Sequence, residues 1–230
     1  MKLQPIALGL SLAAAAFASH QASAYEASDI ILRVGAATVA PDESSSELSS
    51  PALGGRVAGS SASVDDNTQL GITGTWMLTP NLGLGLLAAT PFEHDVEANT
   101  GALGLGTVDA GSVKHLPPTL TVQYFPMGSG SAIQPYLGAG LNYTTFFSES
   151  VAGELESVLG DGSLTLDDSW GLALEAGIDV ALGENWLLNA AVWYLDIDTT
   201  ATFRFDSGVR VKTDVDIDPW VYALTLGYRF

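Results

Sequence analysis

Apolar and polar residues alternate with a period of two along most of the chain. In the clearest stretch, 220–230, an aromatic residue or leucine stands at every second position. A period of two is that of a β-strand, whose successive side chains point to opposite faces. The alternation predicts eight strands, at 30–39, 69–78, 82–89, 115–124, 137–144, 170–180, 188–194 and 220–230.

The connections between these strands alternate strictly between short and long. The short ones are 79–81, 126–132 and 182–185, and the long, acidic ones are 40–66, 93–111, 148–168 and 199–216. Outer-membrane barrels have this parity, with short periplasmic turns and long extracellular loops. The pattern predicts an all-β fold, an eight-stranded antiparallel transmembrane β-barrel with both termini on the periplasmic side. No internal run reaches the roughly 18 apolar residues of a membrane-spanning helix.

The aromatic residues indicate which face of each strand meets lipid. On the apolar face they cluster near strand ends, where the girdles of a membrane barrel lie. These residues are Trp76, Tyr124, Tyr143, Trp170, Tyr194, Trp220, Tyr228 and Phe230. The alternative is a soluble barrel in which the same side chains form the core.

The first 24 residues have the three parts of a secretory signal peptide. Lys2 supplies a positive charge, 6–18 is apolar or small, and Ala22-Ser23-Ala24 offers small residues before a cleavage site. We therefore expect residues 1–24 to be removed and 25–230 to form the mature barrel. The apolar run is too short to span a bilayer.

Composition narrows the possible functions. The chain has 26 acidic and 8 basic side chains, for a net charge of −18, which excludes a phosphate-binding surface for nucleic acid. With no cysteine, disulfides and thiolate metal sites are excluded. His94 and His115 belong to no recognisable catalytic motif, so we expect no enzyme and no cofactor; a lipid-modifying hydrolase or acyltransferase is the minor alternative.

Alternating acids occupy the last long connection and its ends, at Asp196, Asp198, Asp214, Asp216 and Asp218. Their spacing lacks the glycine and closing glutamate of an EF-hand loop. We interpret them as a solvated hairpin and expect no metal site. Divalent ions that bridge these acids to lipopolysaccharide phosphate are the alternative.

Several segments resemble the OmpW family of outer-membrane proteins, in the same order along nearly the whole mature chain. They are DNTQLG at 66–71, LLAATPF at 86–92, HLPPTL at 115–120, PYLGAGLNYTTFF at 135–147, DSWG at 168–171, VWYLDIDTT at 192–200 and DPWVYALTLGYRF at 218–230. The resemblance implies an eight-stranded barrel in the bacterial outer membrane with a narrow, partly hydrophobic lumen. It also implies passage of small hydrophobic molecules.

Strand parity assigns residues to the lumen. An eight-stranded barrel is too narrow for a wide aqueous pore. Leu87 and Trp193 are the candidates for a constriction, with Ala89, Ala191, Leu195 and Ile197 as further lining. We expect only Glu175, Asp179 and Arg229 as charged members of the lumen, toward its periplasmic half. In the alternative interpretation, these side chains simply fill the barrel.

Prolines mark a candidate lateral opening. Pro91, Pro117 and Pro118 lie near the outer ends of two neighbouring predicted strands. Proline donates no ladder hydrogen bond, so three of them at similar height weaken the wall. The hypothesis is release of ligand into the outer leaflet; otherwise the prolines mark strand ends or a bulge.

The last strand ends with aromatic residues at Tyr228 and Phe230. This pattern resembles the terminal strand that the barrel assembly machinery recognises in outer-membrane proteins. With outer-membrane lipids and lipopolysaccharide, that machinery is an expected partner.

Two functions follow from these observations. The first is a channel for small hydrophobic ligands. The alternative is a structural or surface-interaction barrel whose acidic loops contact lipopolysaccharide, cations or other partners. A continuous apolar cavity in the lumen favours the first, and a packed polar interior favours the second.

Overall fold

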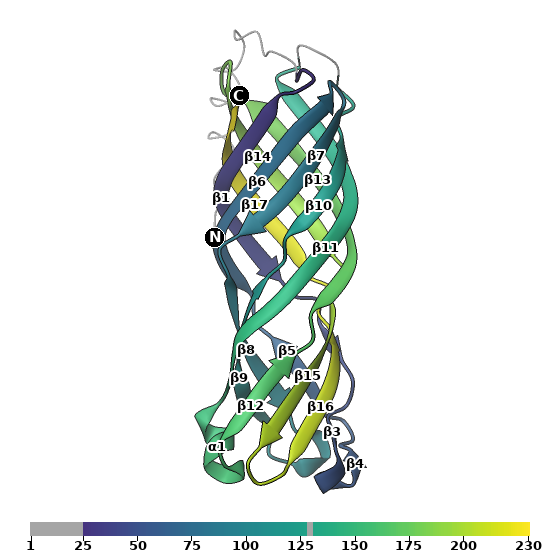
Figure 1. Ribbon diagram of the computed structural model, residues 1–230, viewed down its shortest axis with the longest axis vertical. Coiled ribbons are helices and arrows are strands. Elements are labelled where there is room, and N and C mark those ends of the chain that lie inside the picture. Colours follow the sequence, from purple (N-terminus) through teal and green to yellow (C-terminus); the bar gives the residue numbers. More distant parts are fainter. Residues whose placement is uncertain (1–24, 128–130) are drawn as a thin grey trace, which may run out of the picture.

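A computed structural model describes residues 25–127 and 131–230 (Figure 1). In this part of the chain, eight antiparallel strands follow the order β10-β7-β6-β1-β17-β14-β13-β11, and β10 pairs with β11 to close the ring. They are β1 (Ile30–Ala40), β6 (Asn67–Thr79), β7 (Leu82–Ala89), β10 (Thr119–Tyr124), β11 (Ile133–Val151), β13 (Ser169–Ala181), β14 (Trp186–Leu195) and β17 (Trp220–Arg229). The predicted eight-stranded barrel is confirmed. The predicted signal peptide lies outside the described residues.

The long connections contain strands of their own and extend the barrel away from the C-terminus (Figure 1). The C-terminal part of β11 pairs with β9, β9 with β8, and β8 with β5. A second sheet has the order β12-β15-β16-β3-β4, with β2 beside β16. The bounds are β2 (Ser44–Ser45), β3 (Ser49–Ser50), β4 (Gly55–Arg56), β5 (Ser61–Val64), β8 (Phe92–Asn99), β9 (Thr107–Leu116), β12 (Gly162–Leu166), β15 (Asp198–Phe205) and β16 (Arg210–Asp216), with the short helices η2 (Pro51–Leu53), η3 (Gly101–Leu103) and α1 (Gly153–Leu159).

These outer strands were missed in the sequence because charged and hydroxyl residues dominate them. Yet β15 buries Thr199, Ala201, Phe203 and Phe205 at every second position, so the signal was present. The predicted strand at 115–124 was also wrong as a single element. It is interrupted at Pro117 and Pro118, which separate β9 from β10.

The apolar face of the barrel wall points outward, as predicted. Trp170, on the outward face of β13, is 72% exposed. Trp193, on the inward face of β14, is 2% exposed. Leucines share the outward face, among them Leu86, Leu120, Leu137, Leu141, Leu172, Leu174 and Leu224. Because such a surface is stable only against hydrocarbon, this band is the one that contacts lipid.

Aromatic pairs border the apolar band at both ends. Toward the extension, Tyr143 lies 4.7 Å from Trp170 between ring centroids, and Tyr194 lies 5.4 Å from Trp220. At the end with the short turns, Tyr228 lies 5.0 Å from Trp186 and 4.8 Å from Phe230. These are the two girdles predicted from the sequence. Among the described residues, no helix has the length and apolarity needed to cross a membrane.

Candidate functional site

With the short turns taken as the lower end of the barrel, which is the upper end in Figure 1, the lower half of the lumen is built around a buried ion pair. Arg33 on β1 and Asp179 on β13 are 0% and 2% exposed, and Arg33 Nε donates to Asp179 Oδ1 over 2.9 Å. Arg33 Nη2 contacts the second carboxylate oxygen, so the contact is bidentate. Tyr25 and Asn189 also donate to Asp179, over 2.6 and 2.8 Å. This geometry offsets the large desolvation penalty of two buried charges.

Hydrogen bonds continue from the ion pair across the lumen to Glu175. Arg33 Nη1 donates to Thr75 over 2.8 Å, and Thr75 donates to Gln123 over 2.9 Å. Gln123 and Thr121 then donate to the Glu175 carboxylate over 2.9 and 2.7 Å. The lower lumen is therefore a cross-linked polar layer, which we call the floor.

Glycine makes room for the floor within the barrel wall. A Cβ on Gly138 would lie 2.7 Å from Glu175 Oε2, and one on Gly85 would lie 2.4 Å from Gln123 Nε2. Real Cβ atoms do not approach other atoms this closely, so a larger residue at either position would displace the carboxylate or the amide. The absent side chains let the floor fill the bore.

The floor corrects the sequence analysis in two respects. The expectation that only Glu175, Asp179 and Arg229 supply charge to the lumen was wrong, because the buried cation is Arg33. Arg229 instead lies at the periplasmic rim, where its Nη2 donates to the Glu184 carbonyl over 2.8 Å. Arg33 stands between the outward residues Leu32 and Val34, so the alternation could have identified it.

Above the floor, large apolar side chains replace the polar ones. Leu87 and Trp193, the predicted constriction, are 5% and 2% exposed and point inward. They lie on β7 and β14, which are four positions apart in the eight-membered ring and therefore on opposite sides of the bore. Trp193 is paired directly with Glu175 on the neighbouring strand, so it lies where the floor ends.

Three of the other predicted lining residues lie in this apolar region. Leu195 and Ile197 are buried in the same hydrophobic cluster as Trp193, and Ala89 packs against it. Ala191 is also buried, but it pairs with Gly177, between Glu175 and Asp179, so it lies at the height of the floor. Ala89 and Leu87 line a small cavity at the barrel rim, together with Ala37, Val39, Phe92 and Pro117. We call it the rim cavity.

A second apolar cavity lies within the extension, and we call it the outer cavity. Its volume is about 40 Å³. Its walls include Val39, His94, His115, Phe146, Leu164 and Phe203, from six different strands. Val39 lines both cavities, so the two spaces adjoin. The sequence analysis missed the outer cavity because it assigned most of these strands to loops.

The prolines coincide with an interruption of the sheet. The β7–β10 ladder ends at the pair Leu87–Thr119, and the β8–β9 ladder begins at Phe92–His115. Between these ladders, two segments of the chain run side by side without pairing with each other. One contains Pro91, and the other contains Pro117 and Pro118. Pro117 is buried and lines the rim cavity, whereas Pro91 and Pro118 are exposed.

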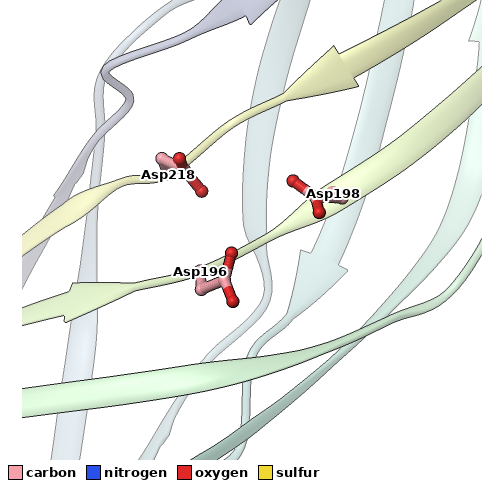
Figure 2. A group of neighbouring side chains, drawn as sticks. All are labelled: Asp196, Asp198 and Asp218. Carbon is pink, nitrogen blue, oxygen red and sulfur yellow. The ribbon is translucent and has the colours of Figure 1, made fainter.

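Three of the alternating acids converge at the upper end of the barrel, at Asp196, Asp198 and Asp218 (Figure 2). One oxygen from each lies within 4.8 Å of the others, which is close enough for a shared cation. Burial, followed by the charges of Asp216 and the two other aspartates, raises the pKa of Asp198 above its ordinary value.

Protein donors already account for part of this cluster. Tyr194 donates to Asp218 over 3.1 Å, and the Ile197 amide donates to the same carboxylate over 3.2 Å. The Leu172 amide contacts Asp196 over 3.4 Å. These bonds join the ends of β13, β14 and β17, so the acids have a structural role without a metal.

Comparison with known proteins agrees with this architecture. The family model described as the OmpW family matches residues 26–230. Outer membrane protein W of Vibrio cholerae is 45% identical over 217 residues, covering 94% of this chain and 95% of that protein. A more distant relative, the dibenzothiophene metabolism operon protein PahQ of Pseudomonas aeruginosa, is 28% identical over 198 residues, covering 86% and 87%.

A solved structure has the same fold. The crystal structure of the outer membrane protein OprG from Pseudomonas aeruginosa matches with a TM-score of 0.84 and 46% identity, covering 92% of this chain and 99% of that one. The lipid-facing band, the closed ring and the family match lead to one conclusion. The chain belongs to the OmpW family and is a bacterial outer-membrane β-barrel.

Proposed function

We propose that the protein binds small hydrophobic molecules and carries them from the outer cavity past the barrel rim into the outer leaflet of the membrane. The observation that carries this proposal is the pair of adjoining apolar cavities above a closed polar floor. A hydrophobic molecule gains from leaving water for such a space, by about 25 cal/mol per Å² of apolar surface buried.

The floor argues against passage straight through the barrel. A hydrophobic molecule on that path would separate Arg33 from Asp179 and offer no hydrogen bonds in return. Breaking a buried pair of this kind costs about 3–5 kcal/mol. The interruption between the two ladders is the easier exit, because no backbone hydrogen bonds have to be broken between 88–91 and 116–118.

The name of one relative supports the same class of ligand. PahQ is named for an operon of dibenzothiophene metabolism, and dibenzothiophene is a flat, apolar aromatic compound. We infer a related class of compound for this protein, handled without a cofactor and without catalysis.

Leu87 and Trp193 are the proposed constriction between the cavities and the floor. Trp193→Ala is expected to change the uptake of a hydrophobic dye, N-phenylnaphthylamine, by cells that carry the protein. Because Trp→Ala in a core costs about 3–5 kcal/mol, Trp193→Phe serves as a milder second variant. Trp186→Ala, on the lipid-facing girdle, is the matched control. Unchanged uptake through folded barrels of both Trp193 variants would contradict the constriction.

A cross-link tests the lateral exit. Ala89 and Pro117 both line the rim cavity, and the register of β7 and β10, continued beyond Leu87–Thr119, sets them opposite each other. In the variant A89C/P117C, the disulfide is expected to reduce dye uptake, and reduction is expected to restore it. The single variant P117C controls for loss of the proline. Equal uptake by the oxidised and reduced forms would argue against lateral release.

The alternative function is a surface-interaction barrel, which the cluster of Asp196, Asp198 and Asp218 favours. In that case Ca²⁺ would join these acids to lipopolysaccharide phosphate, and removal of divalent ions would release lipopolysaccharide from the purified barrel. For biogenesis, we infer that the barrel assembly machinery recognises Tyr228 and Phe230. Deletion of Phe230 should lower the amount of assembled barrel and leave dye uptake per barrel unchanged.

A further inference from the structure

Two histidines stand among the apolar walls of the outer cavity. His94 on β8 and His115 on β9 are 2% and 6% exposed, and their rings stack with centroids 4.9 Å apart at an interplanar angle of 16°. Phe92 and Phe146 flank His115, with centroids 5.5 and 5.9 Å away. The four rings form one aromatic group, and both histidines line the cavity.

The hydrogen bond of His94 defines its tautomer. Its Nδ1 lies 2.6 Å from the backbone carbonyl oxygen of Asp65. A carbonyl oxygen can only accept, so Nδ1 carries the hydrogen and Nε2 of the neutral ring presents a lone pair.

That lone pair is unsatisfied. Within the described part of the chain, Nε2 of His94 is buried and has no hydrogen-bond partner. A buried polar atom without a partner costs about 1–3 kcal/mol, so native proteins usually supply one. Neighbouring atoms cover this nitrogen, although its ring lines a cavity that we propose to be a ligand site. A ligand therefore reaches it when the apolar side chains around it shift.

We propose that His94 Nε2 accepts a hydrogen bond from the hydroxyl group of an otherwise hydrophobic ligand, such as a phenol or a small alcohol. The proposal rests on the proposed function and names the class of ligand that the outer cavity prefers. The ligand would place its apolar body against the aromatic and aliphatic walls and its hydroxyl against Nε2 of His94.

Charge around the cavity argues for a neutral ligand. Glu97 lines the cavity, and the Asp65 carboxylate lies 3.6 Å from His94 Nδ1. Burial, with a smaller contribution from His94, lowers the pKa of His115 to about 3, so His115 carries no charge at neutral pH. No lysine or arginine is among the described residues that line the cavity. A carboxylate would therefore meet negative charge and no cation.

Benzene and phenol form a matched pair of probes, because they differ by one hydroxyl group. Their affinities for the purified barrel in detergent micelles can be compared by calorimetry, with empty micelles subtracted. We expect phenol to bind about five-fold more tightly than benzene, which corresponds to one net hydrogen bond. Benzoate, with the same ring and a negative charge, should bind more weakly than either.

His94→Phe keeps a flat ring in the stack and removes Nε2. This variant should lose the preference for phenol and retain benzene binding. Glu93→Gln, an exposed neighbour on the same strand, is the control and should retain the preference. If His94→Phe does not fold, ¹⁵N-histidine NMR on the unmodified protein remains decisive, because phenol and not benzene should shift the Nε2 resonance of His94.

The outcomes separate the two proposals. If neither benzene nor phenol binds, the proposed function fails, and this inference fails with it. If both bind with equal affinity and the His94 resonance does not respond to phenol, hydrophobic binding stands and the hydroxyl site is wrong. The same conclusion follows if His94→Phe binds phenol as tightly as the unmodified protein does.

Discussion

The floor and the outer cavity share one bore but are built from opposite chemistry. In the floor, Arg33, Asp179 and Glu175 have hydrogen-bond partners from several strands. In the outer cavity, the walls are largely apolar and His94 keeps an unsatisfied nitrogen. Directional bonds hold the floor in one arrangement, whereas apolar contacts are not directional and can re-form around a guest. This difference indicates that the floor closes the barrel and that the outer cavity can change shape to accept a ligand.

The largest expected effect comes from breaking the floor. Arg33→Met leaves the Asp179 carboxylate buried without its cation, and we expect the free energy of unfolding to fall by about 3–5 kcal/mol. Urea unfolding in micelles, followed by tryptophan fluorescence, measures the loss. The double variant R33M/D179M removes both charges and should recover most of it. If the double variant is no more stable than Arg33→Met, the ion pair does not explain the stability of the floor.

A smaller effect is expected from crowding the floor. Gly138→Val places a methyl group where the Glu175 carboxylate lies and should cost about 1–3 kcal/mol. Gly74→Val is the matched control, because no atom lies within 4 Å of a Cβ there. Similar unfolding midpoints for the two variants would show that Glu175 moves aside freely.

Acid should lower the stability of the folded protein, because His115 in the wall of the outer cavity is buried in its neutral form. Its folded-state pKa of about 3 lies below the usual value of about 6.5, so the unfolded chain binds the extra proton first. The contribution of the neutral ring is fully present above pH 6.5. It is lost as the pH falls from 6.5 toward 3, by up to about 1.4 kcal/mol per pH unit.

His115→Phe should flatten this dependence because the ring no longer titrates. Unfolding midpoints measured between pH 3.5 and 7 test the expectation, with Glu93→Gln as the control. A pH profile that is unchanged in His115→Phe would assign the acid sensitivity to other groups.

The smallest effect is expected at the aspartate cluster. The raised pKa of Asp198 means that its ionised form is disfavoured in the folded state, so its contribution to stability decreases as the pH rises through that pKa. Asp198→Asn should relieve the repulsion and stabilise the protein at pH 7 by at most about 0.5 kcal/mol, because the site is exposed. If Ca²⁺ stabilises the unmodified barrel and not the variant, the cluster holds a cation.

Alternation predicted the barrel well because both faces of each wall strand have one consistent environment. Trp170 and Leu172 meet lipid while Ala173 and Glu175 meet the lumen, so a period of two persists over a whole strand. The outer strands were interpreted as loops although some of them alternate as well. In β16, Lys212 and Asp214 are exposed while Thr213 and Val215 are buried. The exposed face carries charges in place of the leucines and aromatic residues that mark the lipid-facing wall.

The sequence predicted those parts of the candidate site that depend on the alternation within a single strand. This alternation placed Leu87 and Trp193 on the inward faces of their strands, and the order of the strands in the ring places them on opposite sides of the bore. The outer cavity needed more, because its walls come from strands as far apart in the chain as Val39 and Phe203. No local pattern specifies which of these side chains meet.

By itself, the sequence determined the eight wall strands and the side of each strand that faces lipid. These properties depend on the solvent preference of each side chain and on the periodicity within a short segment, and both can be read from the sequence. Only the tertiary structure decided that Arg33 meets Asp179, that the wall is interrupted beside Pro117, and that His94 stacks on His115. Those contacts arise from register and closure, which bring together residues separated by up to 146 positions along the chain.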